Sequence, residues 1–420
     1  MIKLPRTGKQ TNDHSDFAED NRANTSSSKA LAFLSLSHFS QHMYVGRSVL
    51  YAYIINELGL NYTQIGVAAG ADSTASGFLQ IFFSLAGRFA PRRLLIALGN
   101  ILMSLASLGI GLSNRFLGFF SSQIVGGVGS AAQHPVSVSI ISERVDNKEV
   151  SKHIGLFYGL GYLGNILSPI LLTAIALAFG WRSALFALAI FPLTTGLLLI
   201  IYLQKDRYSG RSKATEHSLG LWSDIKSALR IKGAVAIIAA QAFLAGGTGQ
   251  GVIATYMPLF LRNGLYLDQL QASFTYSLAM LGGVVGTILF GRYANKLGYL
   301  KTTIACTGVA SVSVLLLSLQ GAFNFMLIPH LIIVGFITFP ISSLMQSGLS
   351  AFSDPEQRDI LLGLYFALGF GASSLWSTLI GLLIDIYGVF NSAWYMMSGL
   401  SVFALSLQIL AYKQRKAVAI

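Results

Sequence analysis

Five ionisable residues lie inside long apolar stretches of this 420-residue sequence. They are His38, His42, Arg47, Asp72 and His134. A charged side chain at the centre of a bilayer costs about 2.5 to 3.5 kcal/mol on insertion scales, so each embedded residue is a candidate functional site. Histidine titrates near neutral pH, and a carboxylate beside a cation can exchange protons as its surroundings change. These residue types therefore indicate proton-linked chemistry inside a membrane.

The positions of these residues depend on the apolar segments that contain them. Hydrophobic residues make up 53% of the sequence and charged residues only 11%, which is unlike a soluble protein of this length. Twelve apolar segments of about 18 to 28 residues are each long enough to cross a hydrocarbon core roughly 30 Å thick. Backbone groups in lipid must pair within their own segment, so an all-α membrane protein with twelve transmembrane helices is predicted. The predicted helices are residues 29–56, 62–87, 94–112, 117–141, 154–178, 183–203, 234–261, 270–290, 302–319, 325–352, 361–384 and 392–412.

The polar stretches divide the chain. Residues 1–28 are predicted to be a disordered cytoplasmic tail, residues 29–204 and 234–412 two six-helix bundles, and residues 413–420 a second tail. The linker 205–233 contains a short amphipathic piece around residues 221–231. With the amino terminus inside, 25 of the 29 Lys and Arg residues fall on the cytoplasmic side. We therefore expect a multi-pass protein of the cytoplasmic (inner) membrane with both termini in the cytoplasm.

The two halves carry matching motifs. Gly87-Arg88-Phe89-Ala90 matches Gly291-Arg292-Tyr293-Ala294 at an offset of 204, and Pro135 matches Pro340 at 205. A third match, between residues 155–158 and 363–366, has an offset of 208. A nearly constant offset over several helices indicates an internal repeat, so the halves are predicted to be parallel repeats.

The second copy resembles the hallmark hairpin of the major facilitator superfamily, Gly-x-x-x-Asp-(Arg/Lys)-x-Gly, except that Asn295 replaces the acid. In the first copy Pro91 stands at the acid position. The resemblance implies the major facilitator fold and a gating role for both hairpins. Their candidate gating residues are Gly87, Arg88, Arg92, Gly291, Arg292, Asn295 and Lys296. A narrower likeness links residues 127–135, ending in His134-Pro135, to the fosmidomycin-resistance-type efflux branch of that superfamily.

Counting along the helices predicts which embedded residues meet. Arg47 and Asp72 each lie roughly ten residues from the turn at 57–61, and His38 and His134 lie at similar depths near the other side. Our hypothesis is that a proton on Asp72 releases Arg47, the alternative being a permanent ion pair. Asp72, His134, His38 and His42 are the candidate proton-coupling residues, the alternative for the histidines being a satisfied polar core. No spacing predicts a metal site.

The second half offers polar groups but no embedded charge. Arg47 from the first half and Gln241, Gln250 and Tyr256 from the second are the candidate substrate-binding residues. Pairs of small residues four apart, such as Gly66 with Gly70 and Gly282 with Gly286, are predicted to pack the halves together, the alternative being packing within one half.

A secondary transporter working by alternating access is the predicted function, with proton-coupled efflux of a small organic molecule as its form. The alternatives are proton-coupled uptake of an organic anion held by Arg47, and a transporter-like receptor or scaffold. An enzyme is not expected, because the embedded residues contain no metal trio or nucleophile pair, and no nucleotide-binding loop or cofactor motif occurs. The expected partners are the substrate, protons and the lipid bilayer, without nucleic acid, and the protein is expected to be a monomer.

Overall fold

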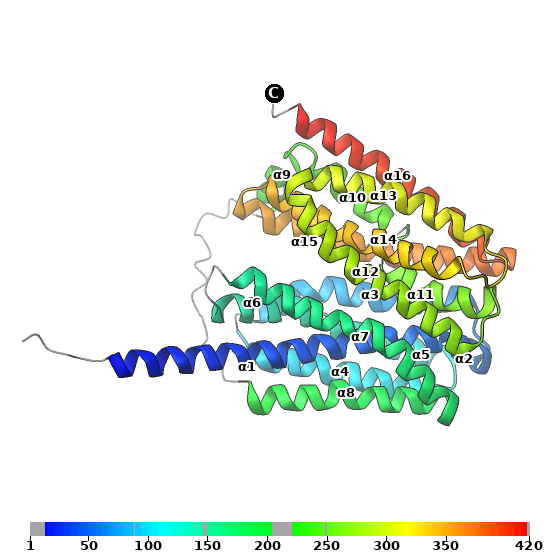
Figure 1. Ribbon diagram of the computed structural model, residues 1–420, viewed down its shortest axis with the longest axis horizontal. Helices are drawn as coiled ribbons and strands as arrows, with labels where there is room; N and C mark the ends of the chain where they lie inside the picture. Colours follow the sequence, from blue (N-terminus) through cyan, green and yellow to red (C-terminus); the bar gives the residue numbers. More distant parts are fainter. Residues whose placement is uncertain (1–12, 88, 146–148, 204–220, 248–249, 418–420) are drawn as a thin grey trace, which may run out of the picture.

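The computed structural model of the protein describes residues 13–87, 89–145, 149–203, 221–247 and 250–417. Within these ranges it contains helices and turns but no strand (Figure 1). The first half comprises α1 (Asp13–Val45), η1 (Gly46–Leu50), α2 (Tyr51–Leu58), α3 (Tyr62–Ala86), α4 (Arg92–Leu112), α5 (Phe116–Ser130), α6 (Gln133–Arg144), α7 (Val150–Phe179) and α8 (Trp181–Tyr202). After α9 (Leu221–Leu229), the second half comprises α10 (Ala234–Leu244), α11 (Gln250–Leu259), η2 (Phe260–Gly264), α12 (Gln269–Leu297), α13 (Tyr299–Leu316), η3 (Leu317–Leu319), α14 (Leu327–Ala351), α15 (Pro355–Tyr387) and α16 (Asn391–Lys416).

Every predicted apolar segment is helical in the part of the chain that the structure describes. Nine helices or helix pairs there are long and apolar enough, by length and composition, to cross a membrane. The other three predicted segments correspond to α1–η1–α2, to α3 and to α10–α11. Many large apolar side chains are exposed on the bundle surface, as at Ile190 and Ile201 of α8, which suits contact with lipid.

Three predicted helices are interrupted. The first passes through the 3₁₀ helix η1, the fourth breaks between α5 and α6, and the seventh breaks between α10 and α11. Glycine favours each break: Gly46 opens η1, and Gly129 and Gly247 lie next to the other two. The prediction of continuous helices was wrong at these points.

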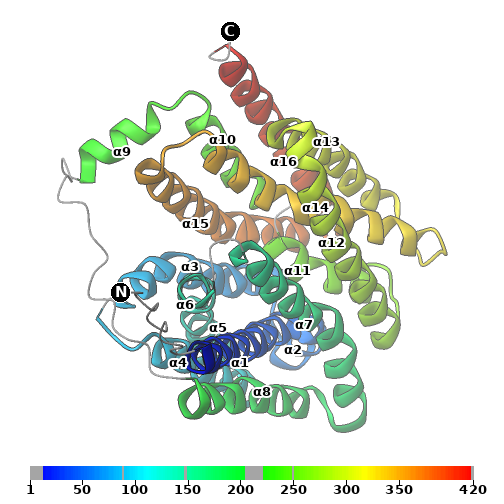
Figure 2. The ribbon, with the colours of Figure 1, turned by 60° about the vertical axis from the view of Figure 1, so that its left-hand side comes forward.

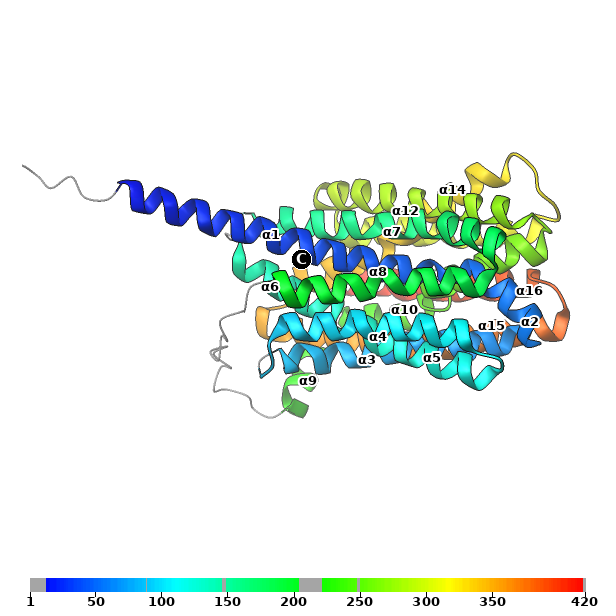
Figure 3. The ribbon, with the colours of Figure 1, turned by 90° about the horizontal axis from the view of Figure 1, so that it is seen from below.

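The first helix also begins earlier than predicted. The structure starts α1 at Asp13, so residues 13–28 differ from the predicted disordered tail. No glycine or proline interrupts the sequence from Asp13 to Val45, which allows the helix to continue through this stretch. In Figure 3 this part of α1 projects beyond the bundle.

The two halves lie side by side (Figure 2). The start of α1, the helix α9 and the end of α16 lie at one end of the bundle, which we call the linker end, and α2 and η2 lie at the opposite end. Across the junction α3 packs against α15 and α7 packs against α12. The linker end is the side predicted to be cytoplasmic.

Small residues shape the packing in two ways. A Cβ on Gly66 or Gly70 would clash with the backbone of Ser377 or Ser374 on α15, so these glycines bring the halves together as predicted. Gly282 and Gly286 instead face α14 within the second half. The alternative of packing inside one half is therefore correct for α12.

Candidate functional site

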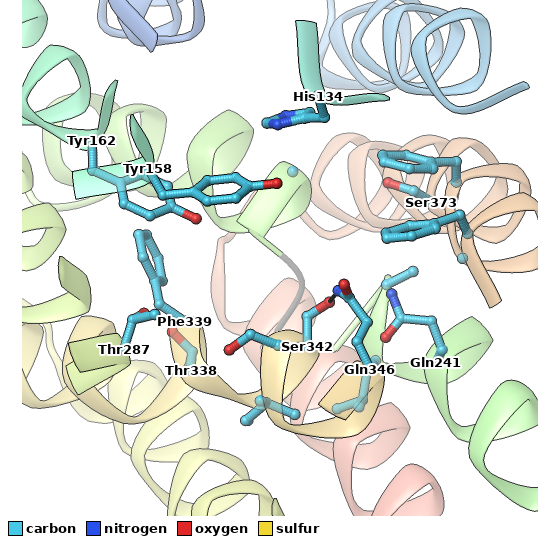
Figure 4. A pocket seen from close by; sticks show the side chains of 18 of the residues that line it. His134, Tyr158, Tyr162, Gln241, Thr287, Thr338, Phe339, Ser342, Gln346 and Ser373 are labelled. Carbon is cyan, nitrogen blue, oxygen red and sulfur yellow. Dashed lines mark hydrogen bonds between the residues drawn. The ribbon is translucent and has the colours of Figure 1, made fainter. Parts of the chain in front are cut away.

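A cavity of about 600 Å³ lies between the halves. The first half lines it from α3, α6 and α7, and the second half from α10, α12, α14 and α15. In Figure 4 His134 and Tyr158 lie on one side and Ser342, Gln346 and Gln241 on the other. Its volume is in the range of small-molecule sites.

The cavity lies toward the linker end of the bundle. Gly155 is near the start of α7 and Gln346 near the end of α14, and both of these helix ends lie at the linker end. At the opposite end the halves are joined by hydrogen bonds. The Tyr256 hydroxyl lies 3.3 Å from the carbonyl of Tyr62, to which it donates, and the Asn263 amide donates to the Tyr62 hydroxyl at 3.0 Å. The structure is thus closed at one end and hollow toward the other.

Arg47 and Asp72 meet as predicted. Arg47 Nη2 lies 3.4 Å from Asp72 Oδ2, joining η1 to α3. Only 4% of the surface of Arg47 is exposed, so its charge depends on its protein partners. The 3₁₀ geometry of η1 places this side chain at an interruption of the first membrane helix, a kind of irregularity that often marks a functional hinge.

Neutral groups complete the environment of this pair. Arg47 donates to the carbonyl of Tyr44 at 2.9 Å and to the side-chain oxygen of Gln123, and its guanidinium lies 3.7 Å from the centre of the Tyr44 ring. Gln123 in turn donates to the Tyr51 hydroxyl. Asp72 Oδ1 is buried and has no hydrogen-bond partner in the described structure. One oxygen of the carboxylate is therefore available to hold a proton.

The three histidines form one cluster. Nε2 of His42 lies 3.1 Å from Nε2 of His38, and the His38 and His134 rings are 5.1 Å apart. Gly161 on α7 leaves space for the His38 ring, because a Cβ at this position would lie 2.0 Å from His38 Nδ1. His38 and His42 are buried, whereas His134 lines the cavity and stacks on Tyr158.

Hydrogen-bond partners define how protons are arranged in this cluster. The carbonyl of Phe157 can only accept, so His38 donates to it from Nδ1, and His38 Nε2 is the acceptor for His42 Nε2–H. His42 Nδ1 lies 3.0 Å from the Asn165 side-chain oxygen, which also accepts. With this amide orientation the His38–His42 pair holds one extra proton shared between the two Nε2 atoms, and with the amide turned both rings are neutral. The cluster therefore has a place for one extra proton.

The second half contributes a hydrogen-bonded group that contains the predicted residue Gln241 together with Tyr365 and Ser342, which the sequence analysis missed. The Tyr365 hydroxyl donates to Gln241 at 2.8 Å and lies 2.9 Å from the Ser342 hydroxyl, to which Gln346 donates at 3.2 Å. Gln241, Ser342 and Gln346 line the cavity. The pairing of Gly155-Leu156-Phe157-Tyr158 with residues 363–366 was the available signal, because it places Tyr365 opposite the histidine cluster.

Several predicted substrate-binding residues do not line this cavity. Arg47 is enclosed with Asp72, and Tyr256 lies fully buried in the closed junction, bonded to Ser377. Gln250 begins α11, but its side chain lies outside the described part. Of the four, Gln241 alone lines the cavity in this conformation. Substrate binding by these four residues stays a prediction, because helix spacing does not show where the two halves close.

The candidate gating hairpins differ from prediction. α12 continues to Leu297, so Gly291, Arg292, Asn295 and Lys296 are helical and the turn is reduced to Gly298 with a φ of 91°. Gly87 lies in a turn, and Arg88 lies outside the described residues. Arg92 donates to both oxygens of Glu143, which ties α4 to α6 within the first half. Arg92 therefore stabilises the packing of α4 against α6 in the first half.

Among the described residues no group of three or more His, Cys, Asp or Glu side chains is arranged to hold a metal ion. The site consists of an ion pair, a histidine cluster and neutral polar groups around a cavity. Such a set can bind a small polar molecule and exchange protons, and it is built on a bundle of membrane-type helices. The fold and site therefore define a membrane carrier.

The sequence matches the Major Facilitator Superfamily over residues 32–377, and the chain belongs to that family. It is 34% identical over 130 residues to the "Probable L-galactonate transporter" of Escherichia coli (strain K12), covering 31% of this chain and only 28% of that protein. It is 24% identical over 292 residues to the "Probable sulfoacetate transporter SauU" of Cupriavidus necator, covering 67% of each chain.

A solved structure of the nucleoside transporter NupG has the same fold, with a TM-score of 0.74 at 14% identity over 91% of this chain and 99% of that one. The family and these similar proteins are transporters, not enzymes. The protein is therefore a multi-pass membrane transporter of a small molecule.

Proposed function

We propose that the protein couples the movement of a small organic anion to protons by alternating access. The observation that carries the proposal is the Arg47–Asp72 pair, in which one enclosed guanidinium has a single carboxylate partner. Protonation of Asp72 removes that partner, and an anionic substrate can replace it at Arg47 when the halves open at that level.

The charge of the site supports an anion. When Asp72 is protonated, Arg47 carries an unbalanced positive charge, and the histidine cluster has a place for one further proton. L-galactonate and sulfoacetate, named in two similar proteins, are themselves small organic anions. Gln241 and Gln346 add neutral hydrogen-bonding groups suited to hydroxyls of the substrate.

Proton-exchanging efflux of an amphipathic molecule is the second candidate. Apolar side chains supply much of the cavity wall, including Val284, Phe339 and Phe370. This lining accommodates an apolar compound without a specific charge partner. The inner-membrane location, the cytoplasmic termini and a monomeric state remain predictions, of which the first two rest on the distribution of Lys and Arg.

Flux into proteoliposomes with an imposed pH gradient tests the proposal. An aldonate, a sulfonate, a neutral sugar and an apolar cation are compared in wild type, Arg47→Gln and Arg115→Gln, the last being an exposed arginine at the start of α5. We expect gradient-driven accumulation of an anion that Arg47→Gln abolishes and Arg115→Gln retains. Movement of an apolar cation against the gradient, unaffected by Arg47→Gln, favours efflux. A receptor or scaffold predicts no flux of any compound.

A further inference from the structure

A second hollow, of about 390 Å³, lies at the linker end of the second half. Residues 229–233 between α9 and α10 form one wall, and Gln414 and Ala417 near the end of α16 form another. Arg230 and Lys232 both line it. It is separate from the cavity between the halves, with which it shares no lining residue.

Cations gather around this hollow without acidic partners. Lys226 lies one turn before Arg230 on α9, and the last turn of α16 carries Lys413, Arg415 and Lys416. In the described structure none of these forms an ion pair with a carboxylate. A positive potential is therefore concentrated here.

Part of this basic surface is held in place by packing. The Arg415 guanidinium lies 4.5 Å from the centre of the Phe352 ring, and its side chain runs close to Gly233. Gly233 has a φ of 88°, which turns the chain sharply from α9 into α10. The turn keeps Arg230 and Lys232 beside the end of α16.

Apolar side chains border the same hollow. Leu229 and Val235 both line it, and they expose 36% and 53% of their surface. Exposed apolar side chains do not stabilise a free anion in water. A phospholipid carries a phosphate joined to acyl chains, and the acyl chains can contact such side chains. Basic pockets beside membrane helices on the cytoplasmic side are suited to such headgroups.

We propose that this hollow binds the headgroup of an anionic phospholipid, with its phosphate between Arg230 and Lys232 and its acyl chains along Leu229 and Val235. The proposal is independent of the substrate. A bound lipid would hold the start of α10, the helix that carries Gln241 to the cavity.

The test is a lipid titration of the purified full chain in detergent, read by native mass spectrometry. Phosphatidylglycerol is compared with phosphatidylcholine in wild type and in a variant with Arg230→Gln and Lys232→Gln. Each cation near a membrane surface contributes about 1 kcal/mol, so we expect the double variant to bind phosphatidylglycerol about 30-fold more weakly at low ionic strength. Phosphatidylcholine binding should be weaker in wild type and unchanged by the substitutions.

A matched control neutralises two exposed lysines away from the hollow, Lys29→Gln and Lys301→Gln, and should retain wild-type affinity. Equal loss in the control, or equal binding of both lipids, overturns the proposal. Inorganic phosphate at millimolar concentration is a further arm. Displacement of phosphatidylglycerol by phosphate that itself binds through Arg230 and Lys232 would show a free-anion site and contradict the lipid assignment. The salt dependence of phosphatidylglycerol binding to wild type is a further measurement, and it does not depend on whether any variant folds.

Discussion

Asp385 on α15 accepts three hydrogen bonds from the first turn of α3, one from the backbone of Tyr62 at 3.0 Å and two from the backbone and hydroxyl of Thr63 at 2.8 and 2.5 Å. A carboxylate of the second half thus caps a helix of the first half, at the positive end of that helix. The contact exists only while the halves are closed at the end opposite the linker. It therefore stabilises this conformation relative to one that is open there.

Removing this contact should favour opening. Loss of a helix cap typically costs about 1 kcal/mol, so Asp385→Ala should raise the ratio of open to closed molecules about fivefold. Spin labels at Leu112→Cys and Tyr266→Cys, exposed residues of opposite halves, would report the change in distance in a Cys306→Ala background.

The control for that experiment is Asp268→Ala. Asp268 also caps a helix, α12, but through Gln271 of its own half. It should reduce stability without changing the distance distribution. Identical distance distributions for Asp385→Ala and wild type would show that the cap does not bias the conformation.

Neutralising Asp72 should separate transport from the proton gradient. In Asp72→Asn the side chain keeps its shape but cannot exchange a proton, so gradient-driven accumulation should fall to the level seen without a gradient. Exchange of substrate across the membrane at equal pH should persist. Substrate accumulation and counterflow in proteoliposomes measure the two properties.

An uncompensated Arg47 can also destabilise the fold, by about 3 to 5 kcal/mol for a broken buried pair. The double variant Arg47→Gln with Asp72→Asn removes both charges and should recover thermal stability. Unchanged proton coupling in a folded Asp72→Asn protein would identify the pair as a permanent structural link.

Sequence reasoning located much of this architecture. Apolar run length located the helical segments, of which nine in the described residues are long and apolar enough to cross a membrane. Counting residues from the turns put Arg47 level with Asp72 and His38 level with His134, because both helices of each pair rise equally per residue. Both contacts are confirmed. Proton coupling, export and the narrower efflux branch remain predictions.

Other features depend on how the halves meet. Asp385 is an exposed acid near the end of an apolar segment, and nothing in the sequence pairs it with Thr63, which lies over 300 positions away. Tyr256 is a predicted substrate-binding residue, and its hydroxyl also donates to the carbonyl of Tyr62 in the other half. The periodicity of apolar residues shows which face of a helix is apolar. It does not show in which conformation of the two halves that face is covered.

The glycines of α3 offer a test of that closure. A Cβ on Gly66 would lie 2.2 Å from the carbonyl oxygen of Ser377, while one on Gly155 would meet nothing within 4 Å. Gly66→Ala should therefore destabilise the closed conformation by about 1 to 3 kcal/mol, the usual range for overpacking. Gly155→Ala should instead raise stability by about 0.5 to 1 kcal/mol, because alanine favours a helix over glycine where its Cβ meets no neighbour. Thermal unfolding in detergent compares them, and equal shifts would contradict the assigned close contact.

Glu57, near the end of α2, should give a defined pH dependence. Trp181 and Arg182 donate hydrogen bonds to this carboxylate and lower its pKa below the ordinary value of 4.5. The folded protein therefore binds this proton less readily than the unfolded chain, so the contact stabilises the fold fully above about pH 4.5 and is lost as pH falls through the lower folded pKa. Wild type should be more stable than Glu57→Gln at neutral pH, and the difference should shrink toward pH 3. Melting temperatures of both proteins between pH 3 and 7 measure this, with Glu149→Gln, an exposed acid paired with Lys152, as the comparison. A difference in melting temperature between wild type and Glu57→Gln that stays constant over this range would show that the carboxylate charge at Glu57 does not stabilise the fold.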